Sequence, residues 1–310
     1  MTLEPPTPEQ LKRMKQELDQ DPEITKDDVK RLREWLKKQP HLPSHMEDER
    51  LERFLYGCKF SLERTKHVLD TYYRVRATSP DIFCNRDPLS DEVQRNIKDM
   101  SYFVLPKLTS EGYRVTIFRL NNTDVDKFIL QELTKRVVMC LDVRLKEEKC
   151  LSNIMVVDFQ GFTLQHFARF SPTLAGVRKA MLCVQDAFPL RLHQVHFTNC
   201  MPIVDKVAAA FTPLLKEKLV KKFFFHSNLD KLKRHVDPEI LPNEYGGTAG
   251  TFQELNDAWR SKLEGYQKWF AEEEKISKSD ESRRLKKMPQ SASVLQDVSV
   301  EGSFRKLVID

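Results

Sequence analysis

The chain has 310 residues, of which 40% are hydrophobic and 31% are charged, and its formal net charge is +5 at pH 7. This length can bury a large core, and the composition is that of a globular protein rather than a fibrous or disordered one. The sequence contains no run of about 18 apolar residues, which argues against a membrane-spanning helix. Its first residues, MTLEPPTPEQ, lack the basic and apolar regions of a signal peptide, so we expect a cytoplasmic protein.

Residues 1–77 are predicted to form a small helical domain. Helices are expected at Pro8–Leu18, Thr25–Lys38, Glu47–Tyr56 and Ser61–Arg76. Thr25 and Ser61 are the expected N-caps, and Gly57 is expected to end the third helix. Residues 78–89 are predicted to be a linker, after which Ser90 caps a helix that runs to Met100.

Residues 90–248 alternate between strand and helix patterns. Strands are predicted at Tyr113–Leu120, Asn153–Phe159, Arg191–Thr198 and Lys222–His226. Helices are predicted between them, at Asp124–Lys146, from Ser171 to Phe188, at Pro202–Val220 and, after the last strand, at Leu229–His235. Because strands separated by helices form parallel βαβ units, the predicted fold class is α/β, with a small, mostly parallel sheet flanked by helices. A C-terminal helix at 249–272 and a charged, flexible tail at 273–310 are predicted, with a possible docking segment at 302–310.

The segment from Phe188 to Val220 joins two kinds of chemistry. A strand that begins at Arg191 precedes a helix, Pro202–Val220, whose wide apolar face is interrupted by Pro213. Lysines follow at once, at positions 216, 218, 221 and 222. This pattern suits a movable cover over an apolar pocket at a membrane surface. A kinked core helix with a solvated lysine face is the alternative.

Positive charge is concentrated in the last turn of this helix and just after it. Between Lys216 and Arg234 there are seven Lys or Arg residues against two acidic ones, a surplus of five. Such a patch suits anionic lipid headgroups. Nucleic acid is not expected as a partner, because no zinc-finger, RNA-binding or helix-turn-helix motif accompanies the patch. A solvated basic face remains the alternative.

No set of residues assembles into a catalytic or cofactor site. The sequence lacks a phosphate-binding loop, a dinucleotide-binding glycine motif and a nucleophile elbow. Asp158 is interpreted as a turn former after a strand, and His166 as a structural imidazole. His193 and His196 lie on opposite faces of a strand and cannot chelate one metal together. We therefore predict a protein that is not an enzyme, with no catalytic residue, cofactor or metal.

Several short motifs occur in order: IMVVDFQGF at 154–162, His166, Ser171-Pro172, FPLR at 188–191, Asn199 and LPNEYGG at 241–247. With RFL at 53–55 and Phe60, they resemble the CRAL-TRIO (Sec14-like) lipid-binding family over residues 10–250. Within that family the sequence is most similar to the branch of α-tocopherol transfer proteins, retinaldehyde-binding proteins and clavesins. The resemblance implies a helical N-terminal companion domain at 1–77 and a lipid-binding domain at 90–248.

The resemblance also implies a cavity between the sheet and a mobile gate helix, placed here at Pro202–Val220. It would hold one hydrophobic molecule such as a tocopherol, a retinoid or a phospholipid. From the pattern of apolar residues we expect the wall to include Phe162, Phe167, Phe170, Val177, Met181, Val184, Phe197, Ile203, Val207 and Phe211. A basic cleft that binds phosphoinositides would lie beside the gate, with the family's positions falling on Arg191, His193, Lys218 and Lys222, and with Lys59 beside a further position occupied by Cys58.

These predictions describe a monomeric lipid-binding and transfer protein that associates transiently with anionic membranes. Two other functions stay open. A non-transferring scaffold or lipid sensor of the same fold would bind partners through residues 250–310. A nucleotide-dependent α/β enzyme is disfavoured because the sequence lacks a phosphate loop.

Overall fold

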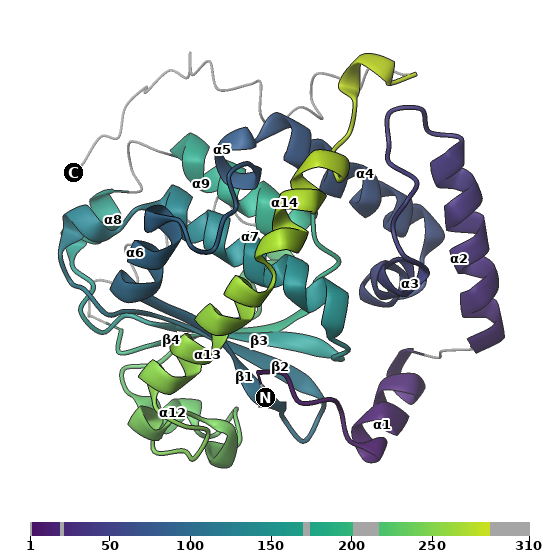
Figure 1. Ribbon diagram of the computed structural model, residues 1–310. Coiled ribbons are helices and arrows are strands. Elements are labelled where there is room, and N and C mark those ends of the chain that lie inside the picture. The colour runs from purple at the N-terminus through teal and green to yellow at the C-terminus, as the bar shows by residue number, and fades with distance from the viewer. Residues whose placement is uncertain (1, 19–21, 170–173, 201–216, 286–310) are drawn as a thin grey trace, which may run out of the picture.

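A computed structural model of the chain describes residues 2–18, 22–169, 174–200 and 217–285 (Figure 1). The N-terminal part forms the helices α1 (Pro8–Leu18), α2 (Pro22–Lys37), α3 (Asp48–Gly57), α4 (Leu62–Thr78), α5 (Pro80–Phe83) and α6 (Asp91–Asp99). The hydroxyls of Ser61 and Ser90 accept hydrogen bonds from backbone N–H groups in the first turns of α4 and α6, so both serines are N-caps as predicted. Thr25 is not a cap, because α2 begins at Pro22, and proline is favoured at the first helical position.

The centre of the molecule is a five-stranded sheet in the order β1-β2-β3-β4-β5. Its strands are β1 (Met100–Leu108), β2 (Tyr113–Leu120), β3 (Ser152–Asp158), β4 (Leu192–Thr198) and β5 (Phe223–Phe225). β1 is antiparallel to β2 and all other neighbours are parallel, which confirms the predicted α/β class. The strand β1 was not predicted. Its register shifts between Val104 and Leu108, around Pro106, which a sheet edge tolerates because no partner needs the missing N–H.

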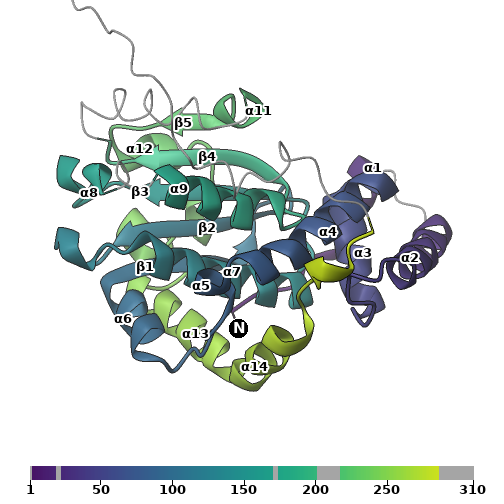
Figure 2. The same ribbon diagram turned by 90° about the horizontal axis from the view of Figure 1, so that it is seen from above.

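Helices lie on both sides of this sheet. On one side are α7 (Leu130–Glu147) and α9 (Leu174–Met181), which continues into a π-helical turn at Leu182–Asp186 (Figures 1 and 2). On the other side lies α12 (Leu229–Leu232), and α13 (Phe252–Gly265) packs along β1. Within the described residues, the other helices are α8 (Leu164–Ala168), α11 (Glu217–Val220), α14 (Gln267–Ile276) and 3₁₀ turns at Val125–Lys127, Pro238–Ile240, Asn243–Tyr245 and Glu281–Arg283. The predicted helix at Asp124–Lys146 is thus a 3₁₀ turn followed by α7, and the one at Leu229–His235 is shorter than expected.

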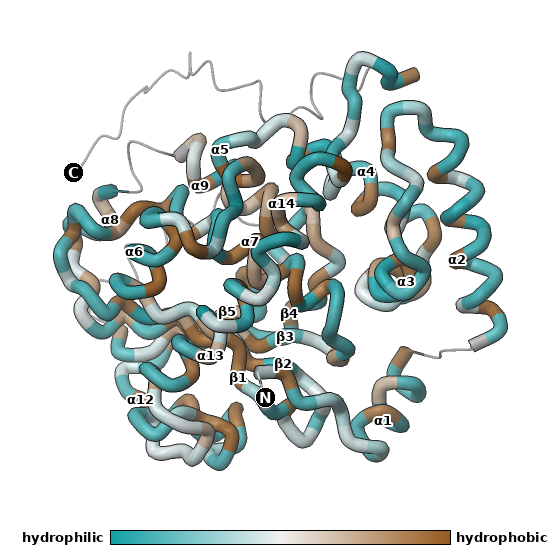
Figure 3. Tube along the Cα trace, viewed as in Figure 1, coloured by the Kyte–Doolittle hydropathy of each residue, from teal (hydrophilic) through white to brown (hydrophobic). Residues whose placement is uncertain are grey.

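The strand register aligns side chains in rows that alternate between the two faces of the sheet. One face, here called the cavity face, carries two rows: Tyr102, Phe118, Val157, Phe197, Phe225, and Val104, Thr116, Met155, Val195, Phe223. The row between them points the opposite way and contains Phe103, Ile117, Val156, His196 and Phe224. In Figure 3 the apolar segments gather at the strands, whereas α2 at the periphery is mostly hydrophilic.

The predicted linker at 78–89 is packed rather than free. It contains α5, whose Ile82 and Phe83 are buried, and Arg86 reaches Asp142 on α7 at 2.6 Å. Arg76 on α4 binds the other carboxylate oxygen of Asp142 at 2.5 Å. This buried carboxylate therefore holds the helical domain against α7.

The C-terminal part differs from the expectation of one helix at 249–272 and a free tail after it. Two helices, α13 and α14, span the region, and residues 273–285 pack back on the N-terminal helices. The buried Arg50 binds Glu273 at 3.0 Å, and Arg284 binds Asp70 at 2.9 Å. A buried guanidinium needs a counter-charge, and Glu273 supplies it from what was expected to be tail. Residues 286–310, with the segment at 302–310, lie outside the described residues.

Candidate functional site

A cavity of about 940 Å³ lies between the cavity face of the sheet and the helices α7 and α9. Aliphatic and aromatic side chains dominate its wall. α7 contributes Leu133, Val137 and Leu141, and α9 with the π-helical turn contributes Val177, Met181 and Val184. A volume and a wall of this kind are typical of sites that enclose an apolar ligand with few polar anchors.

The end of the cavity at the C-termini of the parallel strands is aromatic. The ring of Phe159 lies 5.3 Å from that of Phe162 and 5.4 Å from that of Phe167. It stacks on Phe197 at 5.5 Å, which in turn stacks on Phe225 at 4.9 Å. We call this group of five rings the aromatic end. Offset and edge-to-face contacts of this kind fix the rings in place and leave their free faces to the cavity.

The loop that carries Phe159 and Phe162 is held by Asp158, which is fully buried. One carboxylate oxygen accepts hydrogen bonds from the Gln160 N–H at 2.9 Å and the Asn199 side chain at 2.7 Å. The other accepts from the Tyr245 hydroxyl at 2.7 Å. Gly161 makes the turn at φ 80°. The hydrogen bond from Gln160 agrees with the interpretation of Asp158 as a turn former, and the bonds from Asn199 and Tyr245 make it an anchor that joins three loops as well.

The opposite end, at the N-termini of the parallel strands, is cationic. Lys59, Arg191, His193 and Lys222 line the cavity there, and we call these four residues the cationic end. The Arg191 guanidinium lies 3.5 Å from Glu17 of α1. Its other terminal nitrogen, Nη1, is buried and has no hydrogen-bond partner among the described residues. The imidazole of His193 stacks on Tyr113 at 4.1 Å.

Close packing of two loops brings Lys59 to this end. α3 ends at Gly57, and a Cβ added there would come within 1.8 Å of the Pro189 carbonyl oxygen. The absence of a side chain therefore lets the turn that precedes Arg191 pack directly on the end of α3. Lys59 follows with φ 55°, in the left-handed region.

The positive charges of Lys59, Arg191 and Lys222 lie close enough together to act on one another. Burial lowers the pKa of Lys222, and the charges of Arg191 and Lys59 lower it further. Burial and then Lys222 also lower the pKa of His193, so this imidazole is neutral at pH 7. Lys222 donates a hydrogen bond to the Leu192 carbonyl oxygen. An anion placed among these groups would relieve their mutual repulsion.

The structure brings most of the predicted residues to this cavity. Its wall includes Phe162, Phe167, Val177, Met181, Val184 and Phe197, and its cationic end includes Lys59, Arg191, His193 and Lys222. Phe170, Ile203, Val207 and Phe211 lie outside the described residues, as does most of the predicted gate, Pro202–Val220. The backbone of Lys218 belongs to α11, but its side chain is not described.

Apart from Phe197 on β4, sequence reasoning missed the contribution of the sheet. Thr116, Phe118, Met155, Val157, Phe223 and Phe225 all line the cavity. The two-residue period of the strands could have placed alternate residues on one face, but it does not say which face is hollow. Glu17, the counter-charge of Arg191, comes from α1 and carries no sequence signal.

The fold and the cavity define a class of protein: an α/β domain that contains a largely apolar cavity with one cationic end, preceded by a helical domain. The CRAL/TRIO domain profile matches residues 98–247, and the Pinta-like UBA domain profile matches residues 21–93. An α-tocopherol transfer protein-like protein of Homo sapiens is 32% identical over 83% of this chain and 75% of its own length. The chain belongs to the CRAL/TRIO family.

One further curated protein and one solved structure are also similar to this chain. Clavesin-2 of Homo sapiens is 26% identical over 78% of this chain and 74% of its own length. The crystal structure of Sfh5 aligns with a TM-score of 0.47 at 16% identity, over 87% of this chain and 100% of that one. Among the described residues, no helix has the length and apolar character needed to cross a membrane.

Proposed function

We propose that this protein binds one hydrophobic molecule, such as a tocopherol, a retinoid or a phospholipid, and transfers it between membranes. The observation that carries the proposal is the cavity of about 940 Å³ with an apolar wall and a cationic end. Membership of the CRAL/TRIO family supports lipid binding and transfer in general, and it fits a protein that is not an enzyme.

The apolar wall accounts for retention of a ligand. Burial of each CH₂ group contributes about 0.8 kcal/mol, so a 20-carbon chain supplies on the order of 16 kcal/mol before the costs of immobilisation are subtracted. No covalent chemistry is needed for tight binding. The polarity of the two ends favours a ligand whose hydrocarbon part contacts the aromatic end.

The cationic end accounts for docking. We assign phosphoinositide binding to Lys59, Arg191, His193, Lys218 and Lys222, in the neighbourhood of the proposed gate at Pro202–Val220. Arg191 supports this assignment, because its side chain is only 14% exposed and its buried Nη1 has no described partner. A phosphate group would satisfy that nitrogen with a charge-assisted hydrogen bond. His193 is neutral and serves as a polar contact rather than a charge.

The ligand can be identified directly. Mass spectrometry of an organic extract of the purified full chain is expected to find one hydrophobic species in near-stoichiometric amount. A protein that carries no lipid and takes none from vesicles would contradict the proposal, and would favour a scaffold of the same fold.

Docking is tested by charge reversal. Arg191→Glu and Lys222→Glu are each expected to slow transfer to phosphatidylcholine vesicles that contain a phosphoinositide by about tenfold or more, because each cation near an anionic surface contributes on the order of 1 kcal/mol and reversal adds repulsion. Lys268→Glu, an exposed charge reversal on α14, is the matched control and should transfer normally. Unchanged transfer by both cleft variants, with correct folding by circular dichroism, would contradict the docking proposal.

A further inference from the structure

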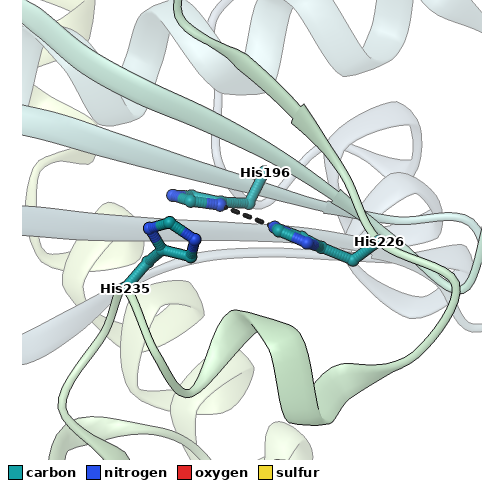
Figure 4. A group of neighbouring side chains, drawn as sticks. All are labelled: His196, His226 and His235. Carbon is teal, nitrogen blue, oxygen red and sulfur yellow. Dashed lines mark hydrogen bonds between the residues drawn. The ribbon is translucent and has the colours of Figure 1, made fainter.

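Three histidines meet on the face of the sheet that points away from the cavity (Figure 4). His196 lies on β4, His226 directly follows β5, and His235 follows α12. One ring nitrogen of each lies within 4.8 Å of those of the other two. We propose that His196, His226 and His235 form a binding site for a divalent transition-metal ion of the zinc class.

The separations fit a single ion after a small movement. Zinc binds imidazole nitrogen at about 2.0–2.1 Å with tetrahedral geometry, which places the ligand nitrogens about 3.4 Å apart. His196 Nδ1 and His226 Nε2 are 2.9 Å apart, in a hydrogen bond that the ion would replace: the two atoms would separate slightly, and the proton on His226 Nε2 would move to Nδ1 of the same ring. His235 is exposed, with its ring 4.8 Å from that of His196, so it can rotate toward the ion.

The backbone holds the three residues in place. The His226 N–H donates to the Phe197 carbonyl oxygen at 2.8 Å, which extends the pairing of β4 with β5 by one residue. The His235 N–H donates to the Leu232 carbonyl oxygen at 2.9 Å, and Leu232 is fully buried. The sheet therefore fixes the backbones of His196 and His226, and a turn anchored in the core carries His235.

The protonation of His196 suits a ligand. Its Nε2 lies 3.0 Å from the Gln194 side-chain oxygen, which can only accept a hydrogen bond, so Nε2 carries the proton and Nδ1 presents a lone pair. Metal-bound histidines commonly donate their second ring nitrogen in this way. Neutral imidazole is the form that binds metal.

The donor set selects the class of ion. Three imidazole nitrogens and no carboxylate favour Zn²⁺, Cu²⁺ or Ni²⁺ over Mg²⁺ and Ca²⁺, which prefer oxygen. Three protein ligands leave the fourth tetrahedral position to water.

A bound ion would stabilise the edge of the sheet that β5 forms. β5 has three residues, forms one end of the strand order and pairs with β4. The proposed site links β4, the end of β5 and the turn after α12. A metal that binds only the folded chain stabilises it by mass action, so the melting temperature should rise with metal concentration.

The experiment uses the full chain, freed of any affinity tag and treated with EDTA. Co²⁺ and Zn²⁺ are titrated, followed by visible absorption for Co²⁺ and by calorimetry for Zn²⁺. We expect one equivalent of Co²⁺ to give d–d absorption without a thiolate charge-transfer band, and Mg²⁺ not to compete. His235→Ala is the main variant, since an exposed residue can be removed without disturbing the core, and His67→Ala is the matched exposed-histidine control.

His235→Ala is expected to weaken metal binding by more than tenfold and to lose the Zn²⁺-induced rise in melting temperature, while its melting temperature in EDTA stays that of the unmodified chain. Gln194→Ala should weaken binding about tenfold through loss of the oriented tautomer. His67→Ala should bind normally. No saturable binding by the unmodified chain, or equal binding by His235→Ala, would overturn the proposal.

Discussion

Val156 and Val157 are neighbours on β3, yet they meet different surroundings. Val156 points away from the cavity and is fully buried, in one cluster with Phe103 and Ile117. Val157 points into the cavity and is half-buried. The same strand thus builds a solid core on one face and the wall of a chamber on the other. On the solid face, side chains make dispersion contacts with their neighbours. On the cavity face, the corresponding contacts form only when a ligand is bound.

This contrast separates residues that stabilise the fold from residues that recognise a ligand. Substitutions in the solid part should lower the free energy of unfolding and leave the shape of the cavity intact. Substitutions on the cavity face should change the shape of the cavity and leave the free energy of unfolding nearly unchanged. The predictions below test this separation, beginning with a buried charged group.

Asp142→Asn should have the largest effect on stability, about 3–5 kcal/mol near neutral pH, because it leaves the guanidiniums of Arg76 and Arg86 buried without their counter-charge. Burial by itself raises the pKa of Asp142. The positive charges of Arg76 and then Arg86 lower it by more, so the net pKa lies below its ordinary value. Its contribution is therefore complete above the unfolded pKa of about 4 and is lost as the pH falls through the folded pKa. Urea unfolding at a series of pH values measures both effects.

The gap in unfolding free energy between the unmodified chain and Asp142→Asn should narrow as the pH falls below about 4. Asp27→Asn, which removes one partner of an exposed ion pair, is the control and should differ from the unmodified chain by less than about 1 kcal/mol. A gap that stays constant down to pH 2 would contradict the assignment.

The next largest effect is the difference in unfolding free energy between alanine variants of the two valines. Val156→Ala removes two methyl groups from a filled core and should cost about 2 kcal/mol, since each buried methyl contributes about 0.8 kcal/mol and the vacated space adds to it. Val157→Ala only enlarges an existing chamber and should cost less than about 1 kcal/mol. Chemical denaturation of both variants under the same conditions measures the two losses in unfolding free energy. Equal losses would mean that the cavity face is as tightly packed as the solid one.

This difference between two adjacent valines also shows what the sequence can predict. The run Ile154–Val157 indicated a strand covered on both faces, and helical periodicity indicated α7, so the α/β class followed. The motif residues Asp158, Asn199 and Tyr245 suggested the family, although their mutual hydrogen bonds could only be seen in the fold. Whether a covering layer fills the space above a strand depends on how helices distant in sequence are placed. Periodicity contains no such information.

Other features could not be predicted from the sequence for related reasons. β1 was missed because Pro106 lies inside it, and a proline within an apolar run argues against a strand. The packing of residues 273–285 was missed because a charged segment looks solvated until its partner is known, and that partner, Arg50, lies far away in the sequence. The histidines at 226 and 235 join His196 only through the pairing of β5 with β4 and the turn after α12. Sequence spacing alone could not bring them together.

Val157→Trp is expected to have the smallest effect on stability and the greatest effect on ligand binding. Val157→Trp places an indole in the chamber of about 940 Å³, so the free energy of unfolding should change by less than about 1 kcal/mol, whereas Val156→Trp should lose about 1–3 kcal/mol or more through overpacking. The same Val157 variant should carry much less co-purified lipid by mass spectrometry and bind the fluorescent apolar probe diphenylhexatriene more weakly. Val156→Ala, folded but destabilised, is the control that should keep its lipid. If Val157→Trp retained full lipid content and probe binding, the ligand would have to lie elsewhere, because a bulky ring in the middle of the cavity face cannot share that space with a hydrocarbon chain.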